Sequence, residues 1–189
     1  MGIENISASQ VSEINKGLSE QVEYFRQRPL EAVYPILWID ALYEKVRYDG
    51  RVVSMALMIA QGVNLDGQRE ILAIEPMLEE SEATWREFFH ALKARGLRKV
   101  NLCVSDAHKG IQAAVRSEWL GASWQRCKIH FMRNILAKIP HREKKSFAAQ
   151  LKQIWLQPDK ESALRMARQL ITIYGKRFPE AIECLESGL

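Results

Sequence analysis

The sequence lacks the features that would place the chain in a membrane or in an oxidising compartment. A membrane helix needs about 18 to 20 consecutive apolar residues, and the longest mostly apolar stretch, Val52 to Ala60, has only the length of a buried strand. Cysteines are few and odd in number, which argues against a disulfide framework and for a reducing cytoplasm. They are Cys103, Cys127 and Cys184. Residues 1–5 lack the basic-then-apolar order of a secretion signal.

What is present is the composition of one ordinary globular domain with a small appendage. The 189 residues are 47% hydrophobic and 26% charged, which excludes a disordered or fibrous chain. The net charge of +4 is unevenly distributed: residues 1–120 carry 14 Lys and Arg against 17 Asp and Glu, whereas residues 121–189 carry 13 against 6. A one-sided basic region can bind a polyanion through counterion release, although a solvated helical surface has the same composition.

Residue periodicity in the first part of the chain predicts a short helix, a connector and an antiparallel meander. Val11, Ile14 and Leu18 share one face of a helix over residues 9–18, and a charged segment with prolines then indicates a connector over residues 19–34. After it, β-branched and apolar residues are interrupted by Asp-Gly turn signals, which predicts three strands joined by short turns. The strands cover residues 36–46, 52–60 and 70–75. The second is almost wholly apolar, so we expect it to be covered on both faces.

The rest of the chain predicts a helix, a fourth strand, a further helix and then a mainly helical segment. Apolar side chains follow helical spacing from Trp85 to Leu92, and a crossover helix implies that the strand at 100–104 is parallel to its neighbour. A short fifth strand is expected at 123–126. Later helices are expected over residues 127–138, 142–156 and 160–174 and from Pro179. This is the order of an α/β, ribonuclease H-like core, a three-stranded antiparallel meander plus a parallel strand with flanking helices, followed by an all-helical segment.

Two aspartates stand where such a sheet would bring them together. Asp40 lies among apolar residues in the first strand, where an unpaired carboxylate is costly to bury. Pairing with a buried Arg or capping a neighbouring element is the structural alternative. Asp106 ends the fourth strand, and a carboxylate at the carboxyl end of a parallel strand points into the crevice where such sheets bind ligands. For Asp106 the structural alternative is a helix N-cap.

The first and fourth strands are neighbours in a ribonuclease H-like sheet, so we expect Asp40 and Asp106 to lie close together. Two adjacent carboxylates repel and are best stabilised by a hard divalent cation such as Mg²⁺ or Mn²⁺, which accepts one or two carboxylates together with waters and phosphate oxygens. Two such ions can activate a water or a 3′-hydroxyl and stabilise the leaving oxygen in phosphoryl transfer.

Cys127 and His130 share a helix face because of their Cys-x-x-His spacing. A structural zinc site needs about four ligands, and no second pair stands at suitable spacing. His130 could contact substrate phosphate near the acids; alternatively, Cys127 packs in the core and His130 is hydrogen-bonded at its edge. Basic side chains around this helix could grip DNA phosphates or be solvated, and Asn134 is the one neutral amide among them. The basic residues are Arg126, Lys128, Arg133, Lys138, Arg142, Lys144 and Lys145.

Three segments together resemble the Mutator-type transposases of bacterial insertion sequences, over nearly the whole chain. They are residues 34–47 around Asp40, the Ser-Asp-Ala-His-Lys-Gly segment at 105–110, and residues 124–134 around the Cys-x-x-His pair. The last segment is the most specific, because the family pairs its second Asp with a downstream Cys-x-x-His block. Members are similar to retroviral integrases in core fold, use an Asp-Asp-Glu triad with Mg²⁺, and cut and join DNA at the inverted repeats of a mobile element.

The resemblance implies a role for each matching residue. Asp40 looks like the first catalytic Asp and Asp106 like the second, both as metal ligands. Cys127 and His130 look like the family's pair, which is expected to position DNA near the catalytic site. Supporting DNA contacts are expected from Arg126, Arg133 and Asn134.

The resemblance also implies a domain plan and one departure from the family. Residues 1–30 are expected to be a remnant of a helix-turn-helix DNA-binding region with its linker, residues 31–137 a partial catalytic core, and residues 138–189 a partial helical insertion. The family's catalytic Glu stands in a Thr-Asn-x-x-Glu segment after the insertion, and no such segment occurs here. We therefore expect a fragment truncated at both ends that lacks the third acid.

If the last helices have lost their partners, they should expose apolar surface. The residues concerned are Trp155, Leu170, Ile171 and Tyr174.

These expectations describe a transposase required for DNA transposition, with Mg²⁺ or Mn²⁺ as cofactor and the inverted repeats and target DNA as partners. The resemblance also admits a homo-oligomer, requires no membrane, and implies a DNA-associated protein of the bacterial cytoplasm. Two alternatives stay open. One is a DNA-binding or regulatory remnant without chemistry, and the other is an unrelated soluble domain whose aspartates are structural.

Overall fold

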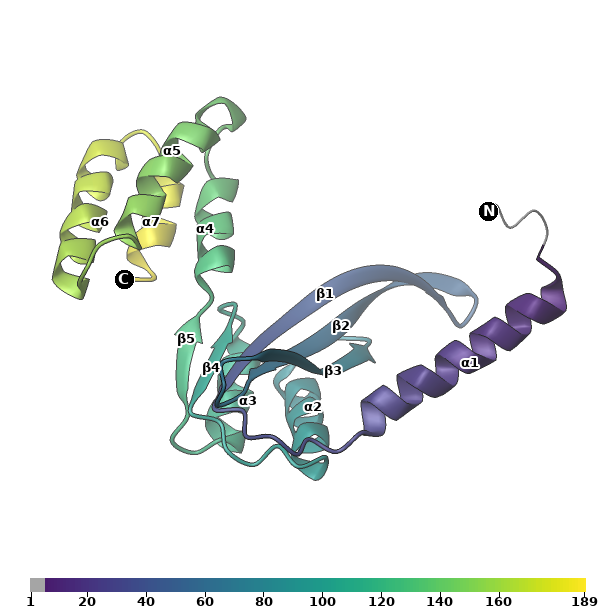
Figure 1. Cartoon of the computed structure of the whole chain (residues 1–189). Helices are drawn as coiled ribbons and strands as arrows, with labels where there is room; N and C mark the ends of the chain where they lie inside the picture. Colours follow the sequence, from purple (N-terminus) through teal and green to yellow (C-terminus); the bar gives the residue numbers. More distant parts are fainter. Residues whose placement is uncertain (1–5) are drawn as a thin grey trace. The chain divides into compact units, whose positions relative to one another are not determined.

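The computed structural model describes residues 6–189 and divides the chain into two compact units (Figure 1). Unit 1 runs to Gln125, and unit 2 comprises residues 126–189. The expectation about a secretion signal at residues 1–5 lies outside the described residues. In the part that is described, no helix is both long and apolar enough to cross a bilayer.

In chain order the elements are α1 (Ala8–Gln27), β1 (Ile36–Tyr48), β2 (Arg51–Val63), β3 (Arg69–Met77), α2 (Glu82–Ala94), β4 (Leu102–Ser105), α3 (Lys109–Glu118), β5 (Ser123–Arg126), α4 (Lys128–Ala137), α5 (His141–Ile154), α6 (Lys160–Tyr174) and α7 (Pro179–Glu186).

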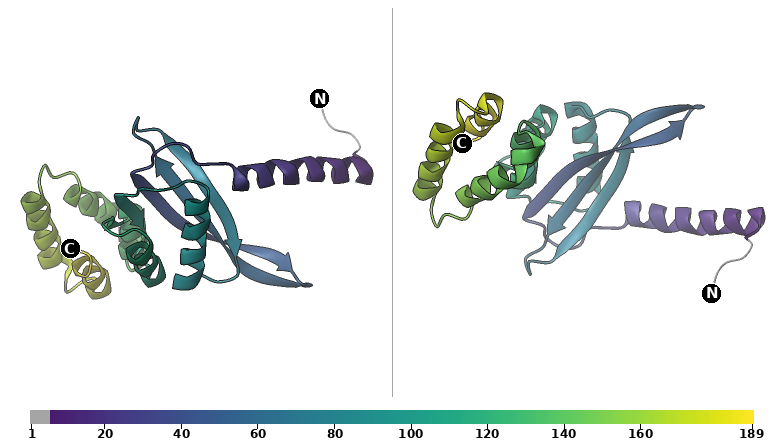
Figure 2. Two further views of the ribbon diagram at one scale, coloured as in Figure 1. Left: turned by 90° about the horizontal axis from the view of Figure 1, so that it is seen from below. Right: turned by 90° about the horizontal axis from the view of Figure 1, so that it is seen from above.

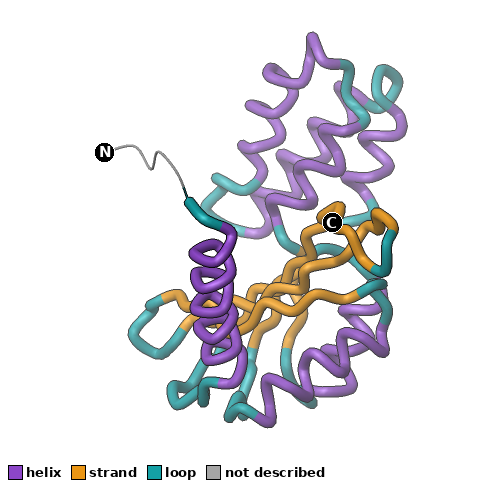
Figure 3. Tube along the Cα trace, turned by 90° about the vertical axis from the view of Figure 1, so that its right-hand side faces the viewer, coloured by secondary structure: helices purple, strands orange, loops and turns teal. Residues whose placement is uncertain are grey.

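Unit 1 is built on a five-stranded mixed sheet in the order β3-β2-β1-β4-β5, drawn orange in Figure 3. β1 and β2 form a long antiparallel hairpin whose two-residue turn has positive φ at both Asp49 (48°) and Gly50 (74°), as this type of turn requires. β3 extends the meander, and β4 pairs with β1 in parallel. The topology is therefore the ribonuclease H-like α/β arrangement expected from the order of elements.

Helices α2 and α3 cover one face of this sheet (Figures 1 and 2). Ser81 caps α2 through the backbone N–H of Thr84, and the apolar face of α2 is fully buried. Trp85 and Phe88 meet edge to face, with ring centroids 5.7 Å apart. From the sheet, alternate residues of β1 and β2 complete this core; they include Leu37, Ile39, Met58 and Ala60.

The expectation that β2 is covered on both faces is wrong. Burial alternates along the strand, with Ala56 and Met58 buried and Leu57 half-buried between them, while Val52 near the hairpin turn is 63% exposed. The reason is that the two helices pack on one face only, so an apolar sequence here does not mean a strand that is buried twice.

Helix α1 is longer than expected, because the charged segment predicted to be a connector continues it to Gln27. Glu, Gln and Arg are good helix formers, so solvated charges at these positions are compatible with a helix. The helix begins at a capping box formed by Ser7 and Gln10 and ends at Arg28, just before Pro29. Its last turn is attached to β3 by the ion pair between Arg26 and Glu75.

Unit 2 consists of the four helices α4 to α7 around a core of their own. The expectation of exposed apolar surface at Trp155, Leu170, Ile171 and Tyr174 is wrong. Leu170 is 2% exposed, and Tyr174 stacks on Phe178 with centroids 5.7 Å apart and meets Phe147 edge to face. α5 and α7 thus supply within unit 2 the partners that we expected to be missing; the remaining two residues, Trp155 and Ile171, pack against the same core.

Along the chain, the boundary between the two compact units lies between residues 125 and 126. The assignment of residues 1–30, 31–137 and 138–189 to three functional regions stays a prediction.

Candidate active site

Asp40 lies on β1, and Asp106 follows directly after β4, the parallel neighbour of β1 in the sheet. The parallel register pairs Trp38 with Val104, and each aspartate stands two residues further along the chain. Both side chains are half-buried. The expected neighbourhood of the first and fourth strands is confirmed. Continued by two residues, the register places the backbones of the two aspartates at the same level, just beyond the carboxyl end of β4.

The turn after β4 holds Asp106 through its own backbone. Asp106 Oδ1 accepts the backbone N–H of His108 at 3.0 Å, an Asx-type turn that leads into α3. The N-cap residue of α3 is His108, so the helix-cap alternative for Asp106 is wrong. The preceding Ser105 is buried, accepts the indole N–H of Trp124 at 2.9 Å and donates to the Asp106 carbonyl at 2.8 Å. The turn is thereby held at Ser105 by Trp124 and at His108 by the Asp106 side chain.

Gly110 lets this turn lie close to the start of α2. A Cβ at this position would stand 2.9 Å from the backbone nitrogen of Glu82 and 3.0 Å from His108 Cε1. A side chain here would push the turn that carries Asp106 away from α2.

Glu80 is the buried acid beside this turn, and we did not single it out from the sequence. Its side chain is only 10% exposed. It accepts the hydroxyl of Tyr43 at 2.8 Å and the indole N–H of Trp85 at 3.2 Å, and its Oε1 lies 3.3 Å from His108 Nδ1. In the sequence it stands beside Glu79 just before a helix cap, which reads as a solvated acidic turn.

The pKa of Tyr43 reflects its loss of hydration and the negative charge around Glu80 and Asp106. Loss of hydration, donation to Glu80 and the negative charges of Glu80 and Asp106 together raise the pKa of Tyr43 to about 12. The hydroxyl therefore stays a proton donor across the physiological range and keeps Glu80 in place. The cluster of Tyr43, Glu80 and His108 ties the outer part of β1 to the turn that carries Asp106.

Asp40 and Asp106 offer oxygen ligands, which suit a hard divalent cation that retains its waters. Among residues 6–189, no three His, Cys, Asp or Glu side chains converge as a ready-made metal site. The donor set is therefore two carboxylates, compatible with Mg²⁺ or Mn²⁺ that completes its coordination with water or phosphate oxygens. Asp40 Oδ1 also accepts the backbone N–H of Ala41 at 2.9 Å.

The other predicted site residues belong to unit 2. Cys127 is the N-cap residue of α4, His130 lies one turn later, and both are half-buried. The Arg126 guanidinium lies over the Phe131 ring, 4.1 Å from its centroid. Its Nε is buried and has no hydrogen-bond partner within the described residues. Exposed polar side chains follow on the same helix at Arg133 and Asn134.

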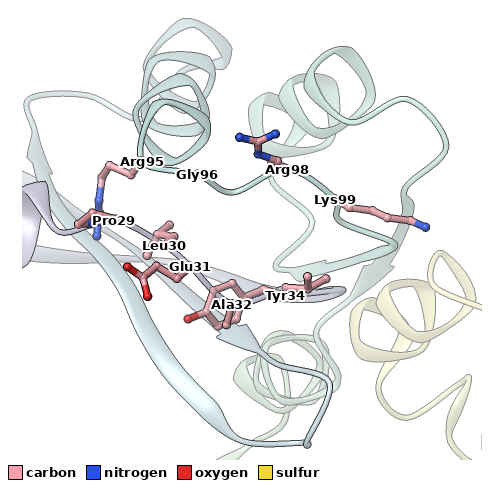
Figure 4. A pocket seen from close by; sticks show the side chains of 10 residues that line it. Pro29, Leu30, Glu31, Ala32, Tyr34, Arg95, Gly96, Arg98 and Lys99 are labelled. Atoms are coloured by element: carbon pink, nitrogen blue, oxygen red, sulfur yellow. The ribbon is translucent and has the colours of Figure 1, made fainter.

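A pocket of about 330 Å³ in unit 1 lies away from the aspartates. Figure 4 shows the segment with Pro29, Glu31 and Tyr34 on one side and the loop with Arg95 and Arg98 on the other. The pocket lies next to the segment that leads into the amino end of β1, and neither aspartate lines it. We therefore place the candidate site at the aspartates and not in this pocket.

A family model and curated relatives both identify transposases, and they match nearly the whole chain. The family model described as "Transposase, Mutator family" matches residues 1–189. The transposase for insertion sequence element IS1081 of Mycobacterium tuberculosis is 42% identical over 189 residues, which are all of this chain and 46% of that protein. The transposase for IS256 in transposon Tn4001 of Staphylococcus aureus is 40% identical over 187 residues, 97% of this chain and 48% of that protein. The chain thus spans about half the length of these relatives. Among solved structures, the Drosophila P element transposase strand transfer complex shares 13% identity over 93% of this chain and 56% of that chain, with a TM-score of 0.43, a similarity too weak to assign function.

Proposed function

The chain belongs to the Mutator family of transposases, and from that premise we propose that it carries part of the DNA-processing core of an insertion-sequence transposase. Asp40 and Asp106 would hold Mg²⁺ or Mn²⁺ for strand cleavage and joining at the inverted repeats of an element. The observation that supports this proposal is the parallel register of β1 and β4, which brings both carboxylates to one level. Bound there, the metal would act as a Lewis acid that activates a water or 3′-hydroxyl for attack on a phosphodiester and stabilises the leaving oxygen.

The surrounding side chains would hold the two carboxylates ready. The backbone N–H of His108 restrains Asp106, and the hydrogen bonds from Tyr43 and Trp85 hold Glu80 beside His108, on the turn that carries Asp106. Preorganised ligands spare the site the reorganisation that a flexible loop would need on binding. In unit 2, we propose that polar side chains on α4 and directly before it contact DNA phosphates. They are Arg126, which precedes the helix, and His130, Arg133 and Asn134 on it, with Cys127 as the N-cap residue.

We propose that this chain alone is catalytically incomplete. Two carboxylates are two thirds of an Asp-Asp-Glu triad, and the described residues bring no third acid to them. Metal binding should then be weak and strand transfer absent. Robust Mg²⁺-dependent DNA cleavage by the chain alone would contradict this part of the proposal.

The metal site is tested by thermal unfolding with and without Mn²⁺. A cation that binds only the folded state raises its stability by about 2.7 kcal/mol at a hundredfold excess over Kd. If binding at two carboxylates is weak, a given Mn²⁺ concentration is a smaller multiple of Kd and the rise in stability is smaller. Asp40→Asn and Asp106→Asn should each abolish the Mn²⁺ effect. The matched control is Asp66→Asn, which removes an exposed turn carboxylate and should keep it.

The two alternative explanations, a structural pair of aspartates and a DNA-binding remnant, predict other results. A purely structural pair would lose stability on mutation, with no metal effect in any variant. A DNA-binding remnant without chemistry is the second candidate function, and the basic character of unit 2 favours it: residues 126–189 carry 13 Lys and Arg against 6 Asp and Glu. It would bind DNA with strong salt dependence, and Asp40→Asn would leave that binding unchanged.

A further inference from the structure

Helix α1 carries an exposed apolar stripe along most of its length of roughly 30 Å. Four of its members are between 46% and 55% exposed, namely Val11, Ile14, Leu18 and Val22. Phe25 continues the stripe and is half-buried beside Arg28. At 100° per residue these five side chains fall within a narrow sector of the helix surface. No residue of α1 is buried, so the described residues of unit 1 leave most of this apolar surface exposed, with Phe25 at its end in contact with Arg28.

The stripe is symmetric about Leu18. Ile14 and Val22 stand four residues before and after it, and Val11 and Phe25 stand seven residues before and after it. Two copies of such a helix can pair antiparallel about a two-fold axis through Leu18. Ile14 of one copy then lies level with Val22 of the other, and Val11 with Phe25. A two-fold interface needs this self-complementarity, because the same surface serves both partners.

The polar residues of α1 are arranged to permit such pairing. Small or uncharged residues flank the stripe on both sides around its centre; they are Asn15, Gly17, Ser19 and Gln21. At Gly17 nothing lies within 4 Å of the position of a Cβ, so a neighbouring helix can approach closely there. The charged residues of the middle of the helix fall on the opposite side; they are Glu13, Lys16, Glu20 and Glu23. Two copies therefore meet without like charges between them.

We propose that the exposed stripe of α1 is a dimerisation surface that binds the same stripe of a second copy of this chain, antiparallel and centred on Leu18. The inference does not depend on the metal site. A single helix pair buries less than the roughly 1,200 Å² of a typical specific interface, so the dimer should be weak and should dissociate on dilution. Because the contact is apolar, salt should not weaken it, in contrast to association through DNA.

Sedimentation velocity of the full 189-residue chain over a concentration series tests the proposal. We expect the mass to rise from that of the 21.8 kDa monomer toward the dimer. Leu18→Glu should raise the dissociation constant at least about tenfold, because it places two charges together in an apolar contact. Tyr24→Glu is the matched control, since Tyr24 is exposed on the same helix but off the stripe, and it should leave the constant unchanged. Far-UV circular dichroism checks that the helix persists, and Leu18→Gln repeats the test without a charge.

Disulfide trapping tests the orientation. Mixed Ile14→Cys and Val22→Cys chains should cross-link with each other, whereas Ile14→Cys chains should not cross-link among themselves. In the antiparallel pair two Ile14 positions stand roughly 12 Å apart along the axis, beyond disulfide reach. The unmodified chain, with its own three cysteines, gives the background. A chain that stays monomeric, equal effects of Leu18→Glu and Tyr24→Glu, or preferential trapping of Ile14→Cys with itself would each overturn the proposal.

Discussion

Glu118 at the end of α3 is the ion-pair centre that fixes α3 to α2, and its removal gives a measurable loss of stability. Its side chain is 6% exposed and lies within ion-pair distance of three cationic or titratable groups of α2. Arg86 Nε is 3.0 Å away, His90 Nε2 2.8 Å and Lys93 Nζ 2.9 Å. The hydrogen bond from Lys93, the one from Arg86 and the positive charges of Lys93 and His90 outweigh the effect of burial and lower the pKa of Glu118 to about 2.

The pKa of Glu118 sets both the size and the pH dependence of the effect. The difference between an ordinary glutamate pKa of 4.5 and about 2 corresponds to about 3 kcal/mol of stability at neutral pH. The partners are 34% to 58% exposed, so solvent screening reduces the expected loss in Glu118→Gln to about 2 kcal/mol. Because the folded-state pKa is lowered, the contribution is complete above about pH 4.5 and is lost as the pH falls toward 2.

Urea unfolding of the parent and of Glu118→Gln between pH 7 and pH 3 measures this contribution. The difference in unfolding free energy should be about 2 kcal/mol at pH 7 and should have lost roughly half or more by pH 3. Glu87→Gln changes an exposed glutamate on α2, the helix that carries the partners of Glu118; it is the control and should be near neutral. A difference that stays constant down to pH 3, or an equal loss in the control, would refute the assignment of this pKa to the network around Glu118.

Two further predictions concern packing and reactivity. Gly62→Ala should destabilise unit 1 by about 1–3 kcal/mol in urea unfolding, because its Cβ would lie 2.5 Å from Tyr34 Cδ1 and 2.8 Å from Leu72 Cδ1, both buried. Cys103 should resist alkylation at pH 8 until the chain unfolds, since burial raises the pKa of its thiol to about 12. Peptide mass spectrometry should find label first on the half-buried Cys127 and Cys184.

The parts of the fold that follow from local pattern were predictable. Asp49-Gly50 dictates a hairpin turn, and the helical spacing from Trp85 to Leu92 dictates which face of α2 is buried. A crossover helix predicts that β4 is parallel, and the ribonuclease H-like order of elements predicts its place beside β1, which the structure shows. These features depend on residues close in sequence or on a general rule of chain topology.

The parts that depend on long-range contacts were not predictable. Glu80 is buried only because Tyr43, 37 residues earlier in the chain, and His108, on the turn after β4, converge on it. The full length of α1 was missed for a related reason. Its second half is charged and solvated, and such a segment has the same composition whether it is a connector or an exposed helix.

The two aspartates of the candidate active site both belong to unit 1. Asp40 lies on β1 and Asp106 directly after β4, and both strands belong to unit 1 and contribute to its core, so the relative position of the aspartates is set within unit 1. A metal effect measured on this chain would therefore show that these two carboxylates suffice to bind a divalent ion weakly. If the unmutated chain is folded and shows no metal effect, the two carboxylates alone do not bind the ion. In that case the sheet positions the carboxylates but does not by itself form the metal site.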